Sequence, residues 1–254
     1  MKRFERFAHR QFKSLICDLK EYRDRKKSET LHEIRIDIKK IKAILGLLNA
    51  SEKQFKAHKN FIPFRNIFRK AGKIRDADVH EHLLRNHEMD KDHCTIGDVS
   101  RQKQFISFAS NIQSFIKTVK RQRNKLEPDL KRVKKNDLSR YLRKQQEEIK
   151  SQLFPRPKMR YIHKTRKAVK EVVYLSEPNG SLTSNEINFY DKIQKKIGEL
   201  HDKQVLLQLL KRQNDQDRKT KCEVTKTECL SDKKEISHLA IDFYRQNARN
   251  QAVV

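Results

Sequence analysis

An internal repeat is the feature that most constrains how this chain can fold. Residues 31–45 (LHEIRIDIKKIKAIL) align with residues 162–176 (IHKTRKAVKEVVYLS), and residues 64–79 (FRNIFRKAGKIRDADV) align with residues 190–205 (YDKIQKKIGELHDKQV). The two patterns occur in the same order both times, which indicates a duplicated structural unit. We therefore expect two similar halves within one domain that spans residues 1–254.

Charged residues match between the two copies as well as apolar ones. In the first pattern the matched polar residues are His32 with His163, Arg35 with Arg166, and Lys39 with Lys170. In the second pattern they are Arg69 and Lys70 with Lys195 and Lys196, Gly72 with Gly198, and Asp76 with Asp202. We place the halves at 1–134 and 138–254 and expect a pseudo-twofold axis between them, because duplicated units commonly pack through a shared interface.

The spacing of apolar residues predicts helices throughout both halves. The chain has only 5 glycines and 5 prolines, and the alternation typical of strands is scarce. The predicted helices cover residues 3–26, 31–50, 53–73, 77–88, 101–135, 138–152, 158–176, 184–199, 203–213 and 235–248. The predicted breaks are 89–100, 154–157, 177–181 and 213–234. This pattern favours an all-α fold of two similar helical halves, in which the breaks are loops that join bundle helices.

A row of basic residues runs beside the apolar stripe of residues 31–45. Leu31, Ile34, Ile38, Ile41 and Leu45 are spaced by 3 and 4 residues, so they form one buried stripe. The row consists of His32, Arg35, Lys39 and Lys42, each one position after an apolar residue. It is turned about 100° from the stripe and rises about 10 Å from Arg35 to Lys42, which suits several successive negative groups.

The second copy and the neighbouring helix of each half add further candidates. Tyr174 follows Lys170 on the same face, and four basic helix faces are expected to line a shared groove, where low-dielectric walls focus the electric field on an anion. The candidate anion-binding residues are His32, Arg35, Lys39, Lys42, Arg65, Arg69, Lys70, Lys73, His163, Arg166, Lys170, Tyr174, Lys192, Lys195 and Lys196.

Two matched pairs are given structural roles. Asp76 and Asp202 each follow a glycine-containing segment and precede a new apolar run, so we expect them to cap the next helix. Gly72 and Gly198 are expected at helix C-termini or at close-packing positions.

The net charge calls for an anionic partner. The chain carries 60 Lys and Arg residues against 33 Asp and Glu residues, a formal charge of +27. Its four cysteines are scattered without a C-x-x-C pair, which fits a reducing compartment. No stretch has the length and hydrophobicity of a membrane span, so we expect a cytoplasmic protein.

The two repeated patterns together resemble the CHAD domain, the conserved histidine α-helical domain. The resemblance rests on LHEIRIDIKKIK, GKIRDADV, IHKTRKAVK and GELHDKQV, which occur in the family's order and span most of the chain. It implies two four-helix subdomains around a basic channel, inorganic polyphosphate as the ligand, no catalysis, and association with polyphosphate granules.

The resemblance points to particular positions and also shows departures. It implicates His32, Arg35 and Lys39, their counterparts His163, Arg166 and Lys170, and the two Lys/Arg pairs at 69–70 and 195–196. Lys42, Arg65 and Lys73 match Val173, Asp191 and Glu199, so the second row is expected to be less cationic. The two histidines either add charge at mildly acidic pH or are packed and donate structural hydrogen bonds; both readings stay open.

Two other classes of function are less favoured. Nucleic-acid binding through the phosphate backbone is the alternative, although no known nucleic-acid-binding motif occurs and aromatic residues make up only 7% of the chain. An enzyme is not expected, because no P-loop, HExxH or GxSxG sequence occurs, and no cofactor is implied. The cluster His80, His82, His87, His93 and Cys94 is interpreted as a polar surface rather than a metal site.

Overall fold

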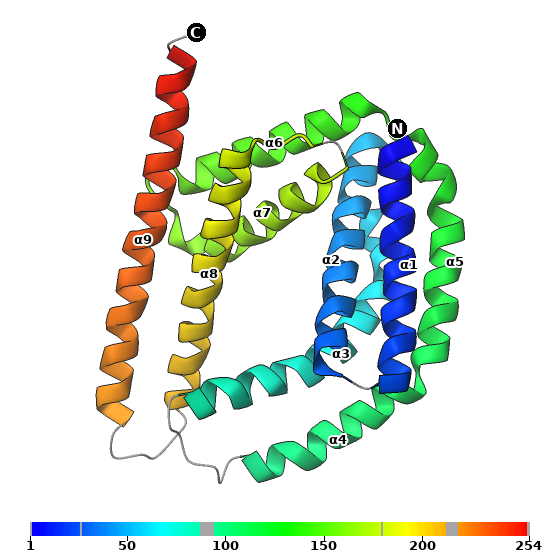
Figure 1. Ribbon diagram of the computed structural model, residues 1–254, viewed down its shortest axis with the longest axis horizontal. Helices are drawn as coiled ribbons and strands as arrows, with labels where there is room; N and C mark the ends of the chain where they lie inside the picture. The colour runs from blue at the N-terminus through cyan, green and yellow to red at the C-terminus, as the bar shows by residue number, and fades with distance from the viewer. Residues whose placement is uncertain (1, 26, 87–93, 179, 212–217, 253–254) are drawn as a thin grey trace. The chain divides into compact units, whose positions relative to one another are not determined.

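The computed structural model (Figure 1) describes residues 2–25, 27–86, 94–178, 180–211 and 218–252, with the side chains of 76–86, 94–101, 218 and 249–252 left out of the description. The predicted all-α fold is confirmed, since no strand occurs within these ranges. The helices are α1 (Lys2–Arg25), α2 (Ser28–Ser51), α3 (Ala57–Asn86), α4 (Cys94–Ser110), α5 (Ile112–Arg132), α6 (Lys135–Leu153), α7 (Ile162–Ser176), α8 (Ser184–Leu210) and α9 (Arg218–Ala252), with a short 3₁₀ helix, η2, at Met159–Tyr161.

The chain divides into two compact units, Met1–Tyr141 and Leu142–Val254. In the first unit α1 lies between α2 and α5, and α2 also packs on α3 (Figure 1). The predicted stripe of α2 is fully buried in this packing: Leu31, Ile34, Ile38, Ile41 and Leu45 are each at most 1% exposed. Removing such side chains from water is the main favourable contribution to folding, at about 25 cal/mol per Å² of apolar surface.

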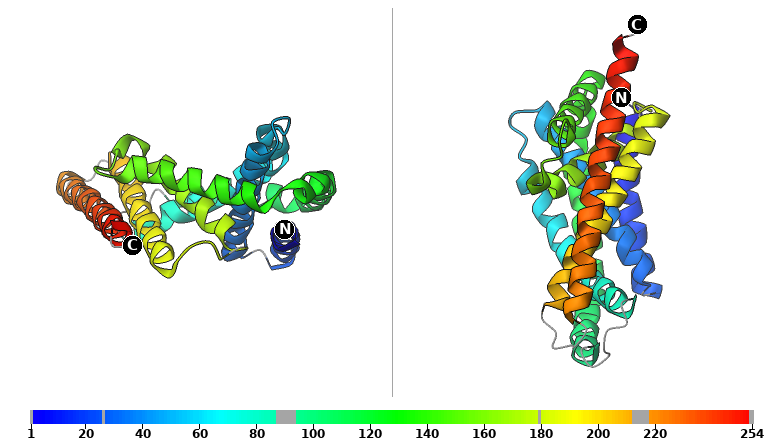
Figure 2. Two further views of the ribbon diagram at one scale, coloured as in Figure 1. Left: turned by 90° about the horizontal axis from the view of Figure 1, so that it is seen from above. Right: turned by 90° about the vertical axis from the view of Figure 1, so that its left-hand side faces the viewer.

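In the second unit α8 packs against both α7 and α9. α8 and α9 lie side by side in every view (Figures 1 and 2). Phe189 of α8 stacks on Phe243 of α9 with ring centroids 3.9 Å apart. α8 begins with a capping box, in which the Thr183 hydroxyl accepts from the Glu186 backbone N–H and the Glu186 carboxylate accepts from the Thr183 backbone N–H.

Two helices run through positions where the sequence predicted breaks. α3 is continuous through Asp76 and α8 through Asp202, so the prediction that these aspartates cap helices is wrong, as is the reading of Gly72 and Gly198 as helix C-termini. Glycine tolerates a helix interior when packing compensates its poor propensity. The predicted breaks at 154–157 and 177–181 are confirmed, and Gly180 takes a positive φ of 57° in the second.

The charged stretch 213–234 is largely helical instead of a loop, since α9 starts at Arg218. Among its charges lies a buried stripe with helical spacing, formed by Thr225, Cys229, Asp232 and Ile236. Two of these residues are polar, which is why the stripe does not stand out by hydrophobicity. The side chains of the predicted His/Cys cluster at 80–94 fall outside the described ones.

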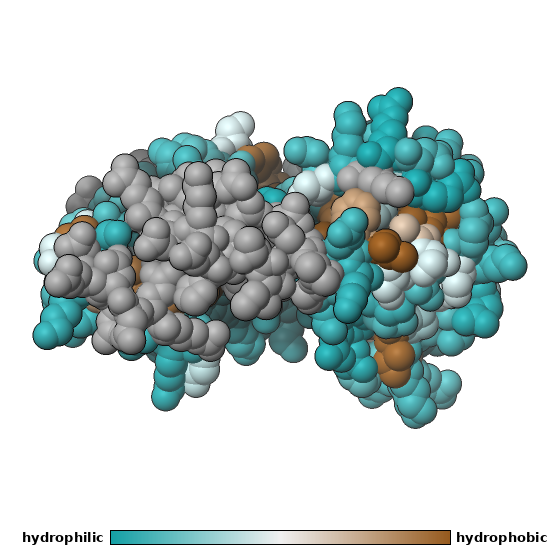
Figure 3. Space-filling model, turned by 90° about the horizontal axis from the view of Figure 1, so that it is seen from below, coloured by the Kyte–Doolittle hydropathy of each residue, from teal (hydrophilic) through white to brown (hydrophobic). Residues whose placement is uncertain are grey.

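The surface is mostly hydrophilic over the described residues seen in Figure 3, with small scattered hydrophobic groups. Exposed large apolar residues such as Ile62 and Leu230 lie on different helices. Within the described ranges, no helix combines the length and the apolar character needed to cross a bilayer.

A carboxyl pair lies in the α1–α2 interface of the first unit. Asp37 is only 4% exposed, and its Oδ2 has no hydrogen-bond partner. Burial raises the pKa of Asp37 to about 7, with the nearby Asp18 carboxylate adding to the rise and Ser14 and Lys40 opposing it. The pKa of Asp18 is raised as well, again mainly by burial, with Glu33 and Glu21 contributing. This interface therefore favours the protonated form of one carboxyl group.

We expect Asp37→Asn to stabilise the protein above neutral pH. The pKa of Asp37 in the folded protein, about 7, lies above the ordinary value of 3.8 for an aspartate, so the native state binds more protons and wild-type stability falls as pH rises between these values. Asparagine removes that loss, and the free energy of unfolding should exceed the wild-type value by up to about 4 kcal/mol near pH 8, with little difference near pH 4. Urea unfolding at both pH values measures this.

The matched control is Asp24→Asn, because Asp24 is exposed and paired with Arg23 at 2.7 Å. It should change stability little at either pH. Equal destabilisation by Asp37→Asn at both pH values would contradict the argument, because it would mean that the carboxylate itself holds α1 against α2.

Candidate functional site

In the first unit, three cations of the α2 row lie over aromatic rings of α3. The Arg35 guanidinium carbon is 4.4 Å from the centre of the Phe68 ring. The Lys39 ammonium is 5.9 Å from the same ring, and the Lys42 ammonium is 5.7 Å from the Phe61 ring. An aromatic face attracts a cation without adding an opposite charge. We call the surface formed by Arg35, Lys39, Lys42, Phe61, Phe68 and Gly72 the α2–α3 face.

Gly72 leaves room for the arginine of this row. A Cβ atom at Gly72 would collide with Nη1 of Arg35, so the guanidinium occupies the space that a side chain would fill. Phe61, Phe68 and Gly72 are separated by 7 and 4 residues, which places them on one face of α3. The half-buried Arg35 thus bridges two packed helices.

The second unit contains the same arrangement at the aligned positions. Arg166 of α7 donates from Nε to the backbone carbonyl of Gln194 on α8 at 3.1 Å. A Cβ atom at Gly198 would lie 2.8 Å from Nη2 of Arg166. Gly198 is the repeat partner of Gly72, and Gln194 is the partner of Phe68. We call the surface formed by His163, Arg166, Lys170, Gln194, Gly198 and His201 the α7–α8 face.

A histidine pair lies at one end of the α7–α8 face. The rings of His163 and His201 meet edge to face, with centroids 5.1 Å apart. Desolvation lowers the pKa of His163, and the neighbouring His201, Lys167 and Arg166 lower it further, while a hydrogen bond with Gln204 opposes them. His201 also contacts the Asp202 carboxylate, with 3.3 Å between Nδ1 and Oδ1. His163 therefore has a second imidazole beside it on the neighbouring helix.

Lys170 lies beside Arg166 and is half-buried. Desolvation lowers its pKa, and the positive charge of Arg166 lowers it further. Tyr174, four residues on, is also half-buried. A cation held in a poorly solvated position gains more from an approaching anion than a fully hydrated one does.

Many of the candidate residues, including two already described, are solvent-exposed cations or histidines on the same four helices. The exposed ones are His32, Lys42, Arg65, Arg69, Lys73, His163, Lys192 and Lys195. Arg65 lies between Phe61 and Phe68 in the sequence and shares their side of α3, as the helical spacing requires. Lys195 lies three residues before Gly198 and therefore near the α7–α8 face.

Lys70 and Lys196 point elsewhere. The Lys70 ammonium lies over Phe115 of α5 at 5.5 Å. Lys196 pairs with Glu199 at 2.7 Å and with two carboxylates of α9, Glu235 at 2.8 Å and Asp232 at 3.7 Å. Each of these lysines comes two residues before the matched glycine, about 160° around its helix. We therefore leave both out of the candidate faces.

Four residues of the faces were missed from the sequence: Phe61, Phe68, Gln194 and His201. The repeat contained a usable indication, since Phe61, Arg65, Phe68 and Gly72 follow the 4-3-4 spacing of one helix face. His201 occupies the position matched by Arg75 in the first copy. A basic side chain therefore occurs at this position in both copies.

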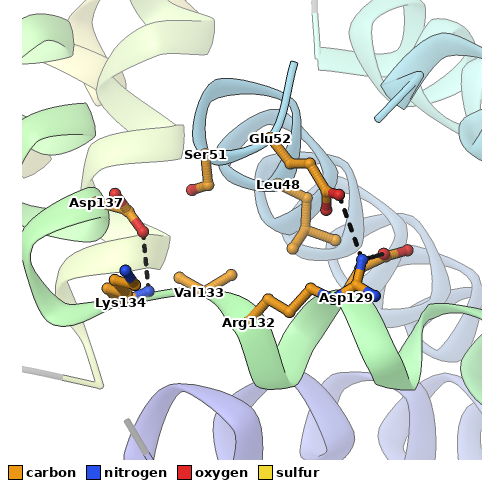
Figure 4. Close-up of a pocket in the computed structure, with 8 residues that line it drawn as sticks. All are labelled: Leu48, Ser51, Glu52, Asp129, Arg132, Val133, Lys134 and Asp137. Carbon is orange, nitrogen blue, oxygen red and sulfur yellow. Dashed lines mark hydrogen bonds and ion pairs between the residues drawn. The ribbon is translucent and has the colours of Figure 1, made fainter. Parts of the chain in front are cut away.

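A small pocket of about 210 Å³ lies at the C-terminal end of α2 (Figure 4). Its polar groups are largely paired, because Arg132 contacts Glu52 at 3.3 Å and the Lys134 backbone N–H donates to Asp137 at 2.9 Å. Three carboxylates line it, from Glu52, Asp129 and Asp137. This lining does not suit an anion, and the pocket contains none of the candidate residues.

The position of Lys196 predicts a role in stability. Asp232 is buried and has Lys196 and Lys203 as partners, with Lys203 at 2.9 Å. Lys196→Ala should lower the free energy of unfolding by about 1 kcal/mol, because three neighbouring carboxylates lose a shared cation while Asp232 keeps Lys203. The neighbouring exposed Lys195→Ala should change it by less than about 0.5 kcal/mol. Equal effects in urea unfolding would contradict the ion-pair assignment.

Comparisons with known proteins agree with this architecture. A crystal structure of the CHAD domain from the plant Ricinus communis matches 94% of this chain and 90% of its own, with a TM-score of 0.67 at 16% sequence identity, which shows a shared fold. Comparison with curated proteins found no match. The family model described as "CHAD domain" matches residues 6–211. Since that match covers most of the sequence, the chain belongs to the CHAD domain family.

Proposed function

We propose that this protein binds inorganic polyphosphate, without turning it over, through the α2–α3 face and the α7–α8 face. The observation that carries the proposal is the arginine that lies in the space beside a helix glycine in both units, Arg35 at Gly72 and Arg166 at Gly198. Each arginine belongs to a longer row of cations. Solubility alone does not require the same placement twice.

The chemistry of each face suits a repeating phosphate chain. A guanidinium group can bind two phosphate oxygens at once, while lysine acts as a mobile point charge. The row from Arg35 to Lys42 covers about 10 Å along α2, enough for more than one phosphate. On the α2–α3 face the rings of Phe61 and Phe68 lie beneath the cations of α2, so their faces are not free to stack on bases.

Membership of the CHAD family supports the same ligand, because polyphosphate binding is what the resemblance implied. A channel shared by the two halves and association with polyphosphate granules in the cytoplasm stay predictions that follow from this proposal. A polyphosphate chain that contacts both faces would be bound more tightly than one that contacts a single face, because the second contact is then intramolecular.

Removing both arginines tests the proposal. Arg35→Ala combined with Arg166→Ala should weaken binding of long-chain polyphosphate by roughly a hundredfold, since a hydrogen bond to a charged group contributes about 1.5–3 kcal/mol. The matched control replaces Arg3 and Arg245, which are exposed arginines on α1 and α9. It removes the same charge and should weaken binding only slightly. Circular dichroism must show unchanged helicity in both variants.

Competition separates polyphosphate from nucleic acid. We expect polyphosphate to stay bound at near-physiological salt when RNA or DNA is present at equal phosphate concentration. Displacement under these conditions, together with equal losses in the two arginine variants, would mean diffuse attraction to any phosphate polymer. Nucleic-acid binding would then be the better proposal. Release of phosphate over time would contradict binding without turnover.

Acidification should strengthen polyphosphate binding through the histidine pair. The pKa of His163 is lowered in the free protein, mainly by desolvation, so its ring is neutral near neutral pH and gains charge only as the solution becomes acidic. Affinity should rise roughly two- to fivefold between about pH 8 and about pH 5.5, in line with up to about 1 kcal/mol for an exposed ion pair. Titrations at constant ionic strength measure this.

His163→Gln combined with His201→Gln should flatten the pH dependence. His238→Gln, on the exposed side of α9, is the control and should leave it unchanged. An identical rise in affinity in the double variant would show that the pair does not contribute.

A further inference from the structure

Two glycines lie in the interior of helices, at positions where helix formation alone does not favour glycine. Gly72 lies inside α3 and Gly198 inside α8, and both helices continue for at least three further turns. Glycine is one of the poorest residues for a helix interior, because it loses the most backbone freedom on folding. Since both units keep a glycine at the aligned position, something other than helix formation requires it.

Close approach of two helix backbones is the usual reason, and it does not apply. The three atoms nearest to a Cβ at Gly72 all belong to the Arg35 guanidinium, and the three nearest at Gly198 all belong to the Arg166 guanidinium. None of them is a backbone atom of a neighbouring helix. The space left by each glycine is therefore used by the end of an arginine side chain.

A second contact holds each guanidinium in that space. In the first unit the Phe68 ring lies 4.4 Å from the Arg35 guanidinium carbon. In the second unit the Gln194 carbonyl accepts from Arg166 Nε at 3.1 Å. Phe68 and Gln194 each come four residues before the glycine, one turn away on the same side of the helix. Each arginine is thus fixed by the glycine space and by the preceding turn.

An arginine fixed in this way is prepared for an anion. Ordering a long, flexible side chain on binding costs conformational entropy, and a side chain already held in place avoids most of that cost. The planar guanidinium also presents its donors in a fixed direction, which two-point recognition of phosphate requires.

We propose that Gly72 and Gly198 are positioning residues for anion binding, which act by seating the guanidinium groups of Arg35 and Arg166 between two helices. This proposal rests on the polyphosphate-binding function proposed above. It assigns to the repeated glycines a role that neither helix packing nor a turn explains.

Alanine at each position separates this role from a structural one, because the two roles predict opposite changes in stability. The colliding atoms are at the flexible end of an arginine, which can move aside, and alanine is the better helix former. Gly72→Ala and Gly198→Ala should therefore keep or raise the melting temperature, by up to about 2 °C. Each should nevertheless weaken binding of long-chain polyphosphate by roughly tenfold, the effect of one misplaced charged hydrogen-bond donor.

Two controls isolate the arginine. Gly46→Ala makes the same change inside α2, where the nearest atom is the Tyr141 hydroxyl at 2.8 Å, and it should leave polyphosphate binding unchanged. In an Arg35→Ala background, Gly72→Ala should cause no further loss of affinity, because there is no guanidinium left to displace. The same comparison applies to Gly198→Ala in an Arg166→Ala background.

NMR of the arginine Nε–Hε groups tests the seating without any ligand. The wild-type protein should show ordered Nε–Hε signals for Arg35 and Arg166, and each alanine variant should make the signal of its own arginine mobile. Equal mobility before and after the substitution would overturn the proposal, as would wild-type affinity in both alanine variants. So would a fall of several degrees in melting temperature, which would make the glycines packing residues.

The outcomes also distinguish this proposal from the proposed function. One outcome is that neither the wild type nor any variant binds polyphosphate, while Arg35 and Arg166 are ordered in the wild type and become mobile in the Gly→Ala variants. The polyphosphate function then fails, but the positioning of the two arginines by the glycines is still supported, and the anion must be a different one. If polyphosphate binds the wild type and both alanine variants equally well, the function stands and the role of the glycines fails.

Discussion

The packing of the apolar stripe of α2 determines where the basic row of the first unit lies. Because Ile34, Ile38 and Ile41 are completely buried between α1 and α3, the residue that follows each apolar position is held at the border of the core. A helix cannot turn one of these rows without turning the other. The cations of α2 therefore lie against α3. The Arg35 guanidinium lies over the Phe68 ring and in the space beside Gly72.

The two units hold the aligned arginine beside a helix glycine through different contacts. An aromatic ring lies under the arginine in the first unit, whereas a backbone carbonyl accepts its hydrogen bond in the second. Arg75 of the first copy corresponds to His201 in the second, where the imidazole meets His163. A guanidinium group in the first copy is thus matched by an imidazole in the second. On the α7–α8 face, His163 gains charge as the solution becomes acidic, and desolvation lowers its pKa.

The sequence was sufficient for those features that depend on periodicity. It predicted the all-α fold, the buried stripe of α2, the breaks before and after α7, and the family. It failed where one-dimensional pattern does not give direction, as with Lys196, which matches Lys70 in the repeat but turns toward the carboxylates of α9. It also read the polar stretch after residue 213 as a loop, because Thr225 and Asp232 occupy buried positions that apolar residues usually fill. The role of Gln194 depends on its backbone carbonyl and on an arginine of the neighbouring helix, and so no local pattern reveals it.

A crystal structure of the protein with polyphosphate of defined chain length tests the central claim most directly. We predict phosphate oxygens within hydrogen-bond distance of Arg35 and Arg166, with both guanidinium groups still beside Gly72 and Gly198. A polyphosphate chain bound along the outer surfaces of α1 or α9, with neither arginine in contact, would contradict it.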